Sequence, residues 1–263
     1  MSCWPDPFPV VLRYLLILAC VPLTAMAQES SLDSISTKYF QHQLGETKVN
    51  VEVTTHKRKK AYVFIRVHDN ETTADSVARE IVENEGGVYI NIINGGRRLM
   101  EFSFQGRNCT FDPNRMFTRT GRLNTLKIFR SYSLAAAQEV KEFASFIISL
   151  IPAHATVIAL HNNTSDEFSI RSYQRPPHKK ASRSVSIHST MDEDDFVFTT
   201  NAALFRHLAN KKINSVLQSS TAPDDGSLSI YYAKRRTKYV NIEAEAGHGS
   251  EQKRMVEAVT GKL

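Results

Sequence analysis

The stretch AYVFIRVHDNETTADSVAREIVENEGG, residues 61–87, decides the fold class of this chain. Residues 61–67 are nearly all apolar or aromatic, as expected for a strand that is buried on both faces. After them, apolar residues recur at intervals of three and four and predict a helix with one buried face; they are Ala74, Val77, Ala78, Ile81 and Val82. Gly86-Gly87 ends this helix. A buried strand followed by an amphipathic helix is the basic unit of an α/β domain.

Outward from this unit, strands and helices keep alternating. Val49, Val51 and Val53 alternate with polar residues, which predicts a half-buried strand ahead of it. Further strands are predicted at about 88–93, 99–104, 156–160, 228–233 and 239–244, further helices at about 133–150, 201–211 and from 250 onwards, and a long surface loop at about 171–195. We therefore expect an α/β fold with a mixed, largely parallel central sheet flanked by helices. In such sheets, functional groups gather at the carboxyl ends of strands.

Residues 1–27 have the pattern of a secretory signal peptide. Arg13 precedes a short apolar run, and Ala25-Met26-Ala27 is a small-x-small cleavage site. Because the run is too short for a membrane span, we expect an exported, periplasmic or extracellular protein with no stable membrane span after cleavage. Apolar residues continue beyond Cys20, which disfavours the alternative of a lipoprotein.

Composition and charge limit the remaining chain. Residues 28–46 are polar and are predicted to form a loose leader, and residues 47–263 to form one catalytic domain. A hydrophobic fraction of 41% and a charged fraction of 23% are ordinary for a globular protein. The net charge of +6 favours acidic partners or substrates but is too dispersed to predict nucleic-acid binding. Beyond the signal peptide, Cys109 is the only cysteine, so His and carboxylate side chains must hold any metal ion.

Two histidines and a glutamate follow predicted strands. His68 and Glu71 come after the strand at 61–67 and are three residues apart, and His161 follows the strand at 156–160. Zinc binds imidazole nitrogen and carboxylate oxygen, and a catalytic zinc site uses three protein ligands and a water molecule. These three residues are therefore candidate metal ligands. Taken singly, each pattern fits equally a residue that caps a helix or ends a strand.

Two further motifs carry charges that a substrate or a reaction could use. Arg107 and Arg115 are eight positions apart in a Pro-containing loop that also holds Asn114. Arginine pairs bidentately with carboxylates, so this loop is suited to anion recognition. Glu243 and Glu245 lie at the end of the last predicted strand, where a buried carboxylate is costly unless it is paired or functional. Both glutamates share one face of the strand, so alternation does not choose between them.

Together these motifs resemble zinc carboxypeptidases of the M14 type, particularly their succinylglutamate desuccinylase/aspartoacylase branch. The resemblance runs from about residue 61 to residue 260. It rests on H-x-x-E at His68 and Glu71, on Arg107 eight residues before Arg115, on D-x-N-R-x-F from Asp112 to Phe117, on the run Leu160-His161-Asn162-Asn163-Thr164, and on Glu243 ahead of Gly247. The interval between Glu71 and His161 suits this branch better than the longer digestive carboxypeptidases.

The resemblance implies a division of work between a metal and a base. It implies one zinc ion per chain, bound by His68, Glu71 and His161. Zinc lowers the pKa of a bound water molecule towards ~7. Glu243 would act as general base and then as proton donor to the leaving amine. The residues by themselves leave Glu245 open as the base.

The resemblance also implies which residues hold the substrate. Arg107 would polarise the scissile carbonyl and stabilise the oxyanion, and Asn114 and Arg115 would bind a free carboxylate of the substrate. The branch has an aspartate two residues before its third metal ligand, where this chain has Ala159. A group that orients the imidazole must therefore come from elsewhere in this chain.

The predicted activity is that of an exported, zinc-dependent amidohydrolase. Its substrate would be a peptide, for example from the cell wall, that is cleaved beside a free carboxylate as in metallocarboxypeptidases. Export favours peptides, because small acyl-amino acids are usually handled inside the cell. An N-acyl amino acid deacylase is the alternative within the same class of enzyme. A binding protein that keeps the fold without turnover is the alternative from another class.

Overall fold

The computed structural model describes residue 1, residues 34–164 and residues 168–263. Residues 34–164 and 168–263 belong to one compact unit, and the predicted signal peptide, apart from Met1, lies outside the described residues. Among the described residues, no helix is both long enough and apolar enough to cross a membrane. The helices and strands of the protein therefore all lie between Ser34 and Leu263 in the part of the chain that the structure describes.

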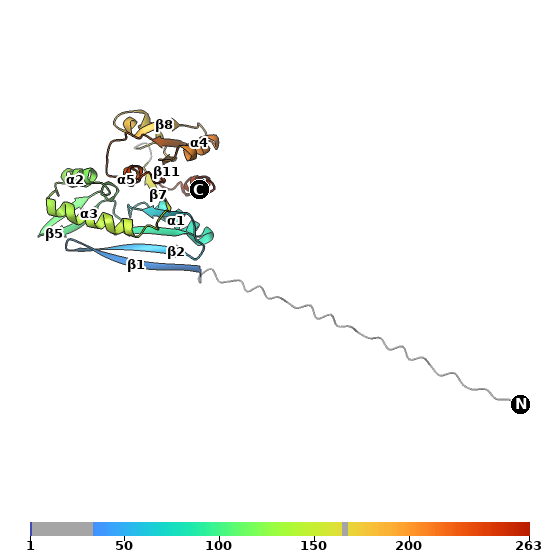
Figure 1. The fold of residues 1–263 in the computed structure, drawn as a ribbon, viewed down its shortest axis with the longest axis horizontal. Coiled ribbons are helices and arrows are strands. Elements are labelled where there is room, and N and C mark those ends of the chain that lie inside the picture. Colours follow the sequence, from blue (N-terminus) through green and yellow to red (C-terminus); the bar gives the residue numbers. More distant parts are fainter. Residues whose placement is uncertain (2–33, 165–167) are drawn as a thin grey trace. The chain divides into compact units, whose positions relative to one another are not determined.

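A nine-stranded mixed sheet forms the centre of this unit, in the order β1-β2-β4-β3-β7-β11-β9-β10-β8 (Figure 1). The strands of the sheet are β1 (Ile35–Leu44), β2 (Thr47–His56), β3 (Tyr62–Arg66), β4 (Val88–Ile93), β7 (Thr156–Asn163), β8 (Ser182–Ser186), β9 (Phe196–Thr199), β10 (Ser215–Gln218) and β11 (Tyr239–Glu245). Strands β4, β3, β7 and β11 are parallel neighbours. A separate two-stranded sheet consists of β5 (Met100–Phe104) and β6 (Arg107–Phe111). The predicted mixed, largely parallel central sheet is confirmed.

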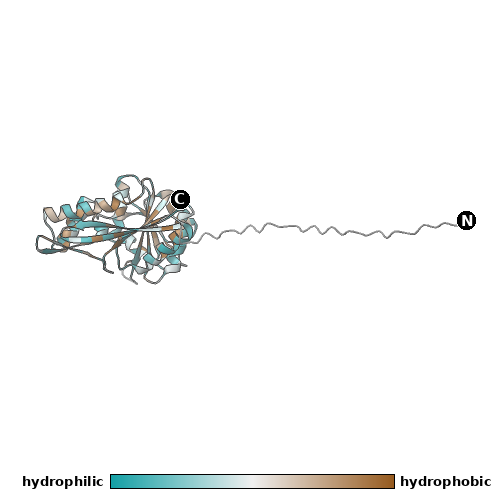
Figure 2. Cartoon of the chain, turned by 90° about the horizontal axis from the view of Figure 1, so that it is seen from below, coloured by the Kyte–Doolittle hydropathy of each residue, from teal (hydrophilic) through white to brown (hydrophobic). Residues whose placement is uncertain are grey.

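Helices cover both faces of the sheet. They are α1 (Thr72–Glu85), α2 (Arg119–Ile128), α3 (Leu134–Ser149), α4 (Ala202–Asn210), α5 (Leu228–Lys234) and α6 (Gly249–Thr260), with short 3₁₀ turns η2 (Pro113–Arg115), η3 (Ile170–Gln174) and η4 (His178–Ala181). Alternate residues of β3 enter two different cores. Val63 packs in the core that contains α3, and Phe64 packs in the core that contains α1 and α6. Figure 2 shows hydrophobic segments recurring along the central strands between these helices.

The predicted leader at 28–46 is wrong for residues 35–44, which form β1. This strand pairs with β2 along its whole length, from Ile35 opposite His56 to Leu44 opposite Thr47. Its side chains are mostly exposed and polar, so the sequence lacks the apolar alternation that would predict a strand here. Gly45 makes the connecting turn at a φ of +58°, and a Cβ there would lie 2.4 Å from the Ser103 carbonyl oxygen. Backbone pairing and this close turn hold β1 in place, together with the burial of Leu44 and the stacking of His42 on Phe146 of α3.

The strand predicted at 228–233 is the helix α5, which corrects that prediction. Leu228, Ile230 and Tyr232 are buried, and their alternation is typical of a strand. The i, i+4 spacing of Leu228 and Tyr232 fits a helix equally well. Tyr232 stacks on Tyr239 of β11 with 5.9 Å between ring centroids. This tertiary contact selects the helix. The loop predicted at 171–195 contains η3, η4 and the edge strand β8, which pairs with β10.

Candidate metal centre and catalytic cleft

Three buried side chains from the carboxyl ends of neighbouring strands converge on one point. His68 and Glu71 lie between β3 and α1, and His161 lies near the end of the adjacent strand β7. His68 Nδ1 is 2.9 Å from Glu71 Oε1, and His161 Nδ1 is 3.0 Å from Glu71 Oε2. One ligand atom from each residue lies within 4.8 Å of the other two. The structure therefore brings together all three predicted metal ligands.

The donor set of these residues fits a zinc ion. Two imidazole nitrogens and one carboxylate oxygen are the protein ligands of many catalytic zinc sites, which leave a further position open. Burial opposes protonation of His68, but the Glu71 and Asp112 carboxylates outweigh this effect and raise the pKa of His68 to about 9. Burial favours the neutral form of Glu71, but the His161 and His68 imidazoles hold the pKa of its carboxyl well below its usual range. The Glu71 carboxyl is thus held ionised between the two imidazoles.

Asp112 supplies an orienting contact that the sequence analysis did not assign. Its Oδ1 lies 2.8 Å from His68 Nε2, so it fixes the ring with Nδ1 facing Glu71. Burial opposes ionisation of Asp112, but its bond with His68 lowers the pKa of Asp112 to about 2. A carboxylate behind a metal-binding histidine is a recurring feature of metal sites. His161 has no such support, since its Nε2 is buried without a hydrogen-bond partner in the described part of the chain. The presence of Ala159 is consistent with this absence.

Glu243 lies on β11 directly opposite His161 on β7. It is 9% exposed, and its Oε1 accepts a hydrogen bond of 2.8 Å from Asn241 Nδ2. Glu243, Glu71 and His161 line a common cavity of about 460 Å³. Glu245 does not line it, and instead joins a surface group with Asp192 and His248. The structure therefore distinguishes two glutamates that sequence alternation left equivalent.

Asn114 and Arg115 line the same cavity from the turn η2. Asp112 caps this turn by accepting a hydrogen bond of 2.8 Å from the Asn114 backbone nitrogen. Asn114 Oδ1 is buried without a partner among the described residues. Arg115 forms an ion pair with Asp225, and both side chains are partly exposed. Both predicted carboxylate-binding residues are thus placed beside the metal ligands.

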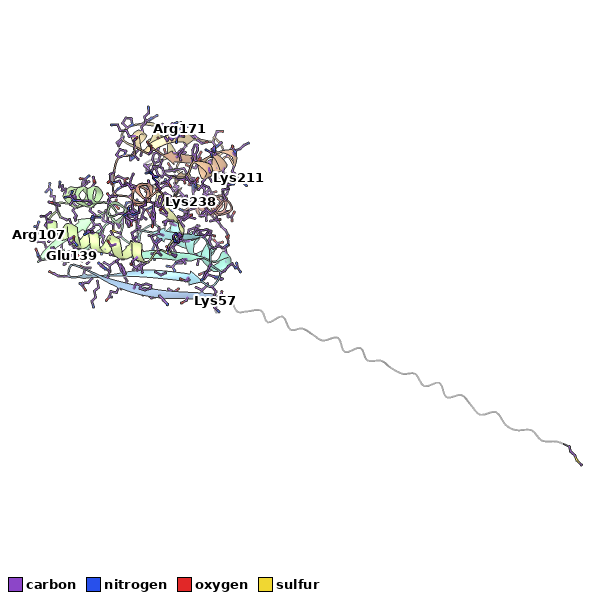
Figure 3. The ribbon with its side chains drawn as sticks, in the orientation of Figure 1. Lys57, Arg107, Glu139, Arg171, Lys211 and Lys238 are labelled. Atoms are coloured by element: carbon purple, nitrogen blue, oxygen red, sulfur yellow. The ribbon has the colours of Figure 1, made fainter. Side chains whose placement is uncertain are left out.

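Arg107 is not brought to this cavity, which corrects its predicted role. It opens β6 in the small β5–β6 sheet, where it is exposed and pairs with Phe104. Figure 3 shows it at the left-hand end of the folded unit. Arg98 lines the cavity instead, and its Nη1 donates to Glu71 Oε1 over 3.1 Å. The eight-residue spacing to Arg115 matches the family pattern, but the strand geometry of β6 places Arg107 away from the metal ligands.

A buried network holds both the metal-binding loop and the loop of Arg98. Arg66 donates to the Glu71 carbonyl oxygen and forms an ion pair of 2.7 Å with Asp69 Oδ1. The other oxygen of Asp69 accepts from the backbone nitrogens of Asn94 and Gly96, at 2.7 and 2.8 Å. The loop that follows β4 is thereby tied to the loop that follows β3. This connection is what brings Arg98 to Glu71, and it is not visible in the sequence.

The comparisons with known proteins support the fold. No protein-family model and no curated protein matches the sequence. The structure is similar to that of thrombin activatable fibrinolysis inhibitor, with a TM-score of 0.50, 14% identity, and coverage of 87% of this chain and 70% of that protein. It is also similar to a succinylglutamate desuccinylase/aspartoacylase from Rhodobacter sphaeroides, with a TM-score of 0.45, 15% identity, and coverage of 88% and 66%.

At these identities the likeness concerns the fold alone. The chain has a carboxypeptidase-like α/β fold, as predicted from the sequence. It spans 66% of the length of the Rhodobacter protein. The arrangement of the metal ligands and of Glu243 is therefore a separate observation, made on the residues of this chain.

The pKa of His68 leads to a prediction for metal binding. At pH 7 a proton occupies His68 in the metal-free protein, since the Glu71 and Asp112 carboxylates raise the pKa of His68 to about 9 despite burial. Zinc must displace this proton, so we expect about one proton released per zinc bound at pH 7. The apparent affinity should rise about tenfold per pH unit up to pH 9. Calorimetry in two buffers of different ionisation enthalpy measures the number of protons released.

The control for this measurement is Asp112→Asn, which removes one carboxylate that raises the pKa of His68 and should reduce the proton release. In the metal-free protein, folding stability depends on pH in the opposite direction to zinc affinity. The raised pKa of His68 adds stability below about pH 6.5, and this stability is lost as the pH rises through 9. Zinc affinity that stays constant between pH 7 and 9 would contradict the proposed charge state of His68.

Proposed function

We propose that this chain is a zinc-dependent hydrolase that cleaves an amide bond beside a free carboxylate. One observation carries the proposal: Glu243 lies opposite His161 on a parallel neighbour strand, beside a buried His-Glu-His group. A zinc ion held there would supply Lewis acidity towards a carbonyl oxygen and a water molecule. Metal-assisted hydrolysis requires residues that bind the metal and, near them, a separate carboxylate that does not bind it and can act as the base.

The side chains of the cavity then have distinct roles. Glu243 removes a proton from the attacking water and later donates it to the leaving amine. Asn241 holds the carboxylate of Glu243 through the hydrogen bond to Oε1 and so fixes its direction. Arg98 donates hydrogen bonds to the oxygen that becomes negatively charged, a task worth about 3 kcal/mol per donor in other hydrolases. Arg98 replaces Arg107 in this role because it lines the cavity.

Asn114 and Arg115 bind the free carboxylate of the substrate in this proposal. Arg115 is engaged by Asp225, but the two side chains are 38% and 48% exposed. Exposed ion pairs contribute little to stability. A substrate carboxylate can therefore replace or join Asp225 at a modest cost. The partly exposed pair keeps the guanidinium beside the cavity when no substrate is bound.

The preferred substrates are peptides, including cell-wall peptides, cleaved at the residue with the free carboxylate. The cavity of about 460 Å³ has room for a side chain in addition to the carboxylate.

We also propose that residues 1–27 direct export. Intact mass analysis of the secreted protein tests this proposal, since it should find Gln28 as the first residue. A screen of peptides and N-acyl amino acids on zinc-loaded protein tests the activity, and hydrolysis of only the acyl amino acids would favour a deacylase. Tight binding without hydrolysis would favour a binding protein.

The metal ligands are tested by His161→Ala. Elemental analysis of this variant, purified without added metal, should show most of the zinc missing, because two ligands hold zinc far less tightly than three. His248→Ala is the matched control, since it removes a histidine from the surface group of Asp192 and Glu245. We expect this control to keep one zinc per chain. Full zinc retention in His161→Ala would remove His161 from the site.

Recognition of the carboxylate is tested by Arg115→Ala. The guanidinium pairs with a carboxylate but not with a neutral amide. We therefore expect kcat/KM to fall at least about tenfold for substrates with a free carboxylate, an effect of about 1.4 kcal/mol, and to change little for their amides. Steady-state kinetics on paired substrates measures both. Equal losses on the acids and the amides would show that Arg115 has a purely structural role.

A further inference from the structure

Beyond the reacting groups, the cavity contains an amide side chain that has no partner. Gln218 ends β10, is 7% exposed and lines the cavity. Its Nε2 and Oε1 are both buried, and neither has a hydrogen-bond partner among the described residues. Buried polar groups in folded proteins almost always have partners. An unsatisfied amide beside a substrate cavity therefore points to a ligand that supplies the missing hydrogen bonds.

The strand order and the cavity show how Gln218 is placed relative to the reaction centre. Asn241 of β11 lies opposite Phe198 of β9, and Val216 of β10 lies opposite the same phenylalanine. Asn241, Phe198 and Val216 therefore share one face of the sheet. The pairing of β10 with β8 shifts register between Leu217 and Gln218, so the alternation along β10 does not place Gln218. Its position is given by the cavity, which Gln218, Phe198 and Asn241 all line. Neighbouring strands are about 4.8 Å apart, so β10 lies roughly 10 Å from β11. The cavity thus extends from Glu243 across two strands to Gln218.

The wall between these two ends is aromatic. Tyr173 packs 5.2 Å from Phe198 and 5.7 Å from Phe168, measured between ring centroids, and all three rings line the cavity. Of the lining residues on β9, β10 and β11, only Glu243 carries a charge, and Asn241 already binds it. A long substrate side chain would therefore pass along apolar rings and meet a neutral amide at its end.

The chemistry of Gln218 selects among possible side-chain ends. The amide offers both a donor and an acceptor, whichever way it is rotated. A carboxylate would pair only with its nitrogen, an ammonium group only with its oxygen, and an apolar group with neither. A carboxamide pairs with both atoms at once. We propose, on the basis of the proposed function above, that Gln218 selects substrates whose residue with the free carboxylate has a glutamine-type side chain.

The proposal is tested with N-acyl dipeptides that differ only in a last residue of Gln, Glu, Lys or Met. We expect kcat/KM for Gln to exceed that of each of the others at least tenfold, because a site built for hydrogen bonds rejects analogues that leave it unpaired. Gln218→Met keeps the shape and removes the amide, so it should lose this preference and favour Met. Gln218→Glu offers only acceptors and should move the preference to Lys.

Ser215→Ala is the matched control. The hydroxyl of Ser215 on β10 is also buried and has no partner in the described part of the chain, but Ser215 does not line the cavity. It should leave the ranking unchanged. Equilibrium binding of the four dipeptides to zinc-loaded Glu243→Gln, with and without Gln218→Met, gives a second readout. Hydrolysis of all four at similar rates overturns the selectivity but leaves the hydrolase intact. If the unsubstituted, zinc-loaded protein binds the Gln dipeptide selectively but does not hydrolyse it, the selectivity is supported and the hydrolase is overturned.

Discussion

Replacing Glu243 by Gln should reduce kcat at least about a hundredfold, the lower end of typical general-base contributions. The amide keeps the shape of the side chain but cannot accept the proton of water. Zinc should remain bound, because the proposed metal ligands are His68, Glu71 and His161 and not Glu243. Steady-state kinetics and elemental analysis on the same preparation separate loss of the base from loss of the metal.

Glu245→Gln is the matched control for this prediction. Glu245 lies two residues further along β11, outside the cavity, with its carboxylate 3.8 Å from His248 Nε2. We expect this variant to keep most of its activity. A large loss in Glu245→Gln together with an active Glu243→Gln would move the base two residues along the strand. Full activity in both variants would overturn the hydrolytic mechanism.

Removing the guanidinium of Arg98 should reduce kcat by about 10² to 10³, the effect of losing one oxyanion donor in other hydrolases. The negative charge on the carbonyl oxygen develops in the transition state, so kcat should fall more than KM rises. Arg98 Nη1 lies 3.1 Å from Glu71 Oε1, which places the guanidinium beside the metal ligands. Kinetics of Arg98→Ala, with zinc content measured in parallel, checks this expectation.

Arg107→Ala is the control that distinguishes the structure from the sequence pattern. Arg107 is exposed on β6 and does not line the cavity. Its loss should change kcat/KM less than about twofold, as is usual for surface substitutions away from a site. A greater loss in Arg107→Ala than in Arg98→Ala would restore the role that the family spacing implies. It would also require the β5–β6 hairpin to move towards the metal ligands.

Local patterns in the sequence predicted the centre of the fold and the three candidate metal ligands that the structure brings together. Strand β3 is buried on both faces, so its continuous apolar run is unambiguous, and the helix after it has a clear 3.6-residue period. His68 and Glu71 are placed by this local turn. His161 is placed by the next parallel strand, because parallel strands bring their carboxyl ends to one edge of a sheet.

Other features carry no local signal. Strand β1 is mostly polar and exposed, and its pairing with β2 defines its whole length. The apolar residues of 228–233 fit a strand and a helix equally, and the stacking of Tyr232 on Tyr239 favours the helix. Arg107 matched a sequence spacing, yet the position of a side chain depends on the direction of its strand.

The sequence by itself determined the class of fold, the buried strand at its centre and the residue types of the candidate metal site. These depend on residue type and on periods of two and 3.6 residues, which are local properties. Only the tertiary structure decided that Arg98 lines the cavity, that Glu243 rather than Glu245 lies opposite His161, and that Gln218 has no hydrogen-bond partner among the described residues. Each of these results from contacts between segments far apart in the chain, such as the bonds from Asn94 and Gly96 to Asp69. The free energy of such contacts depends on distances that the order of residues does not contain.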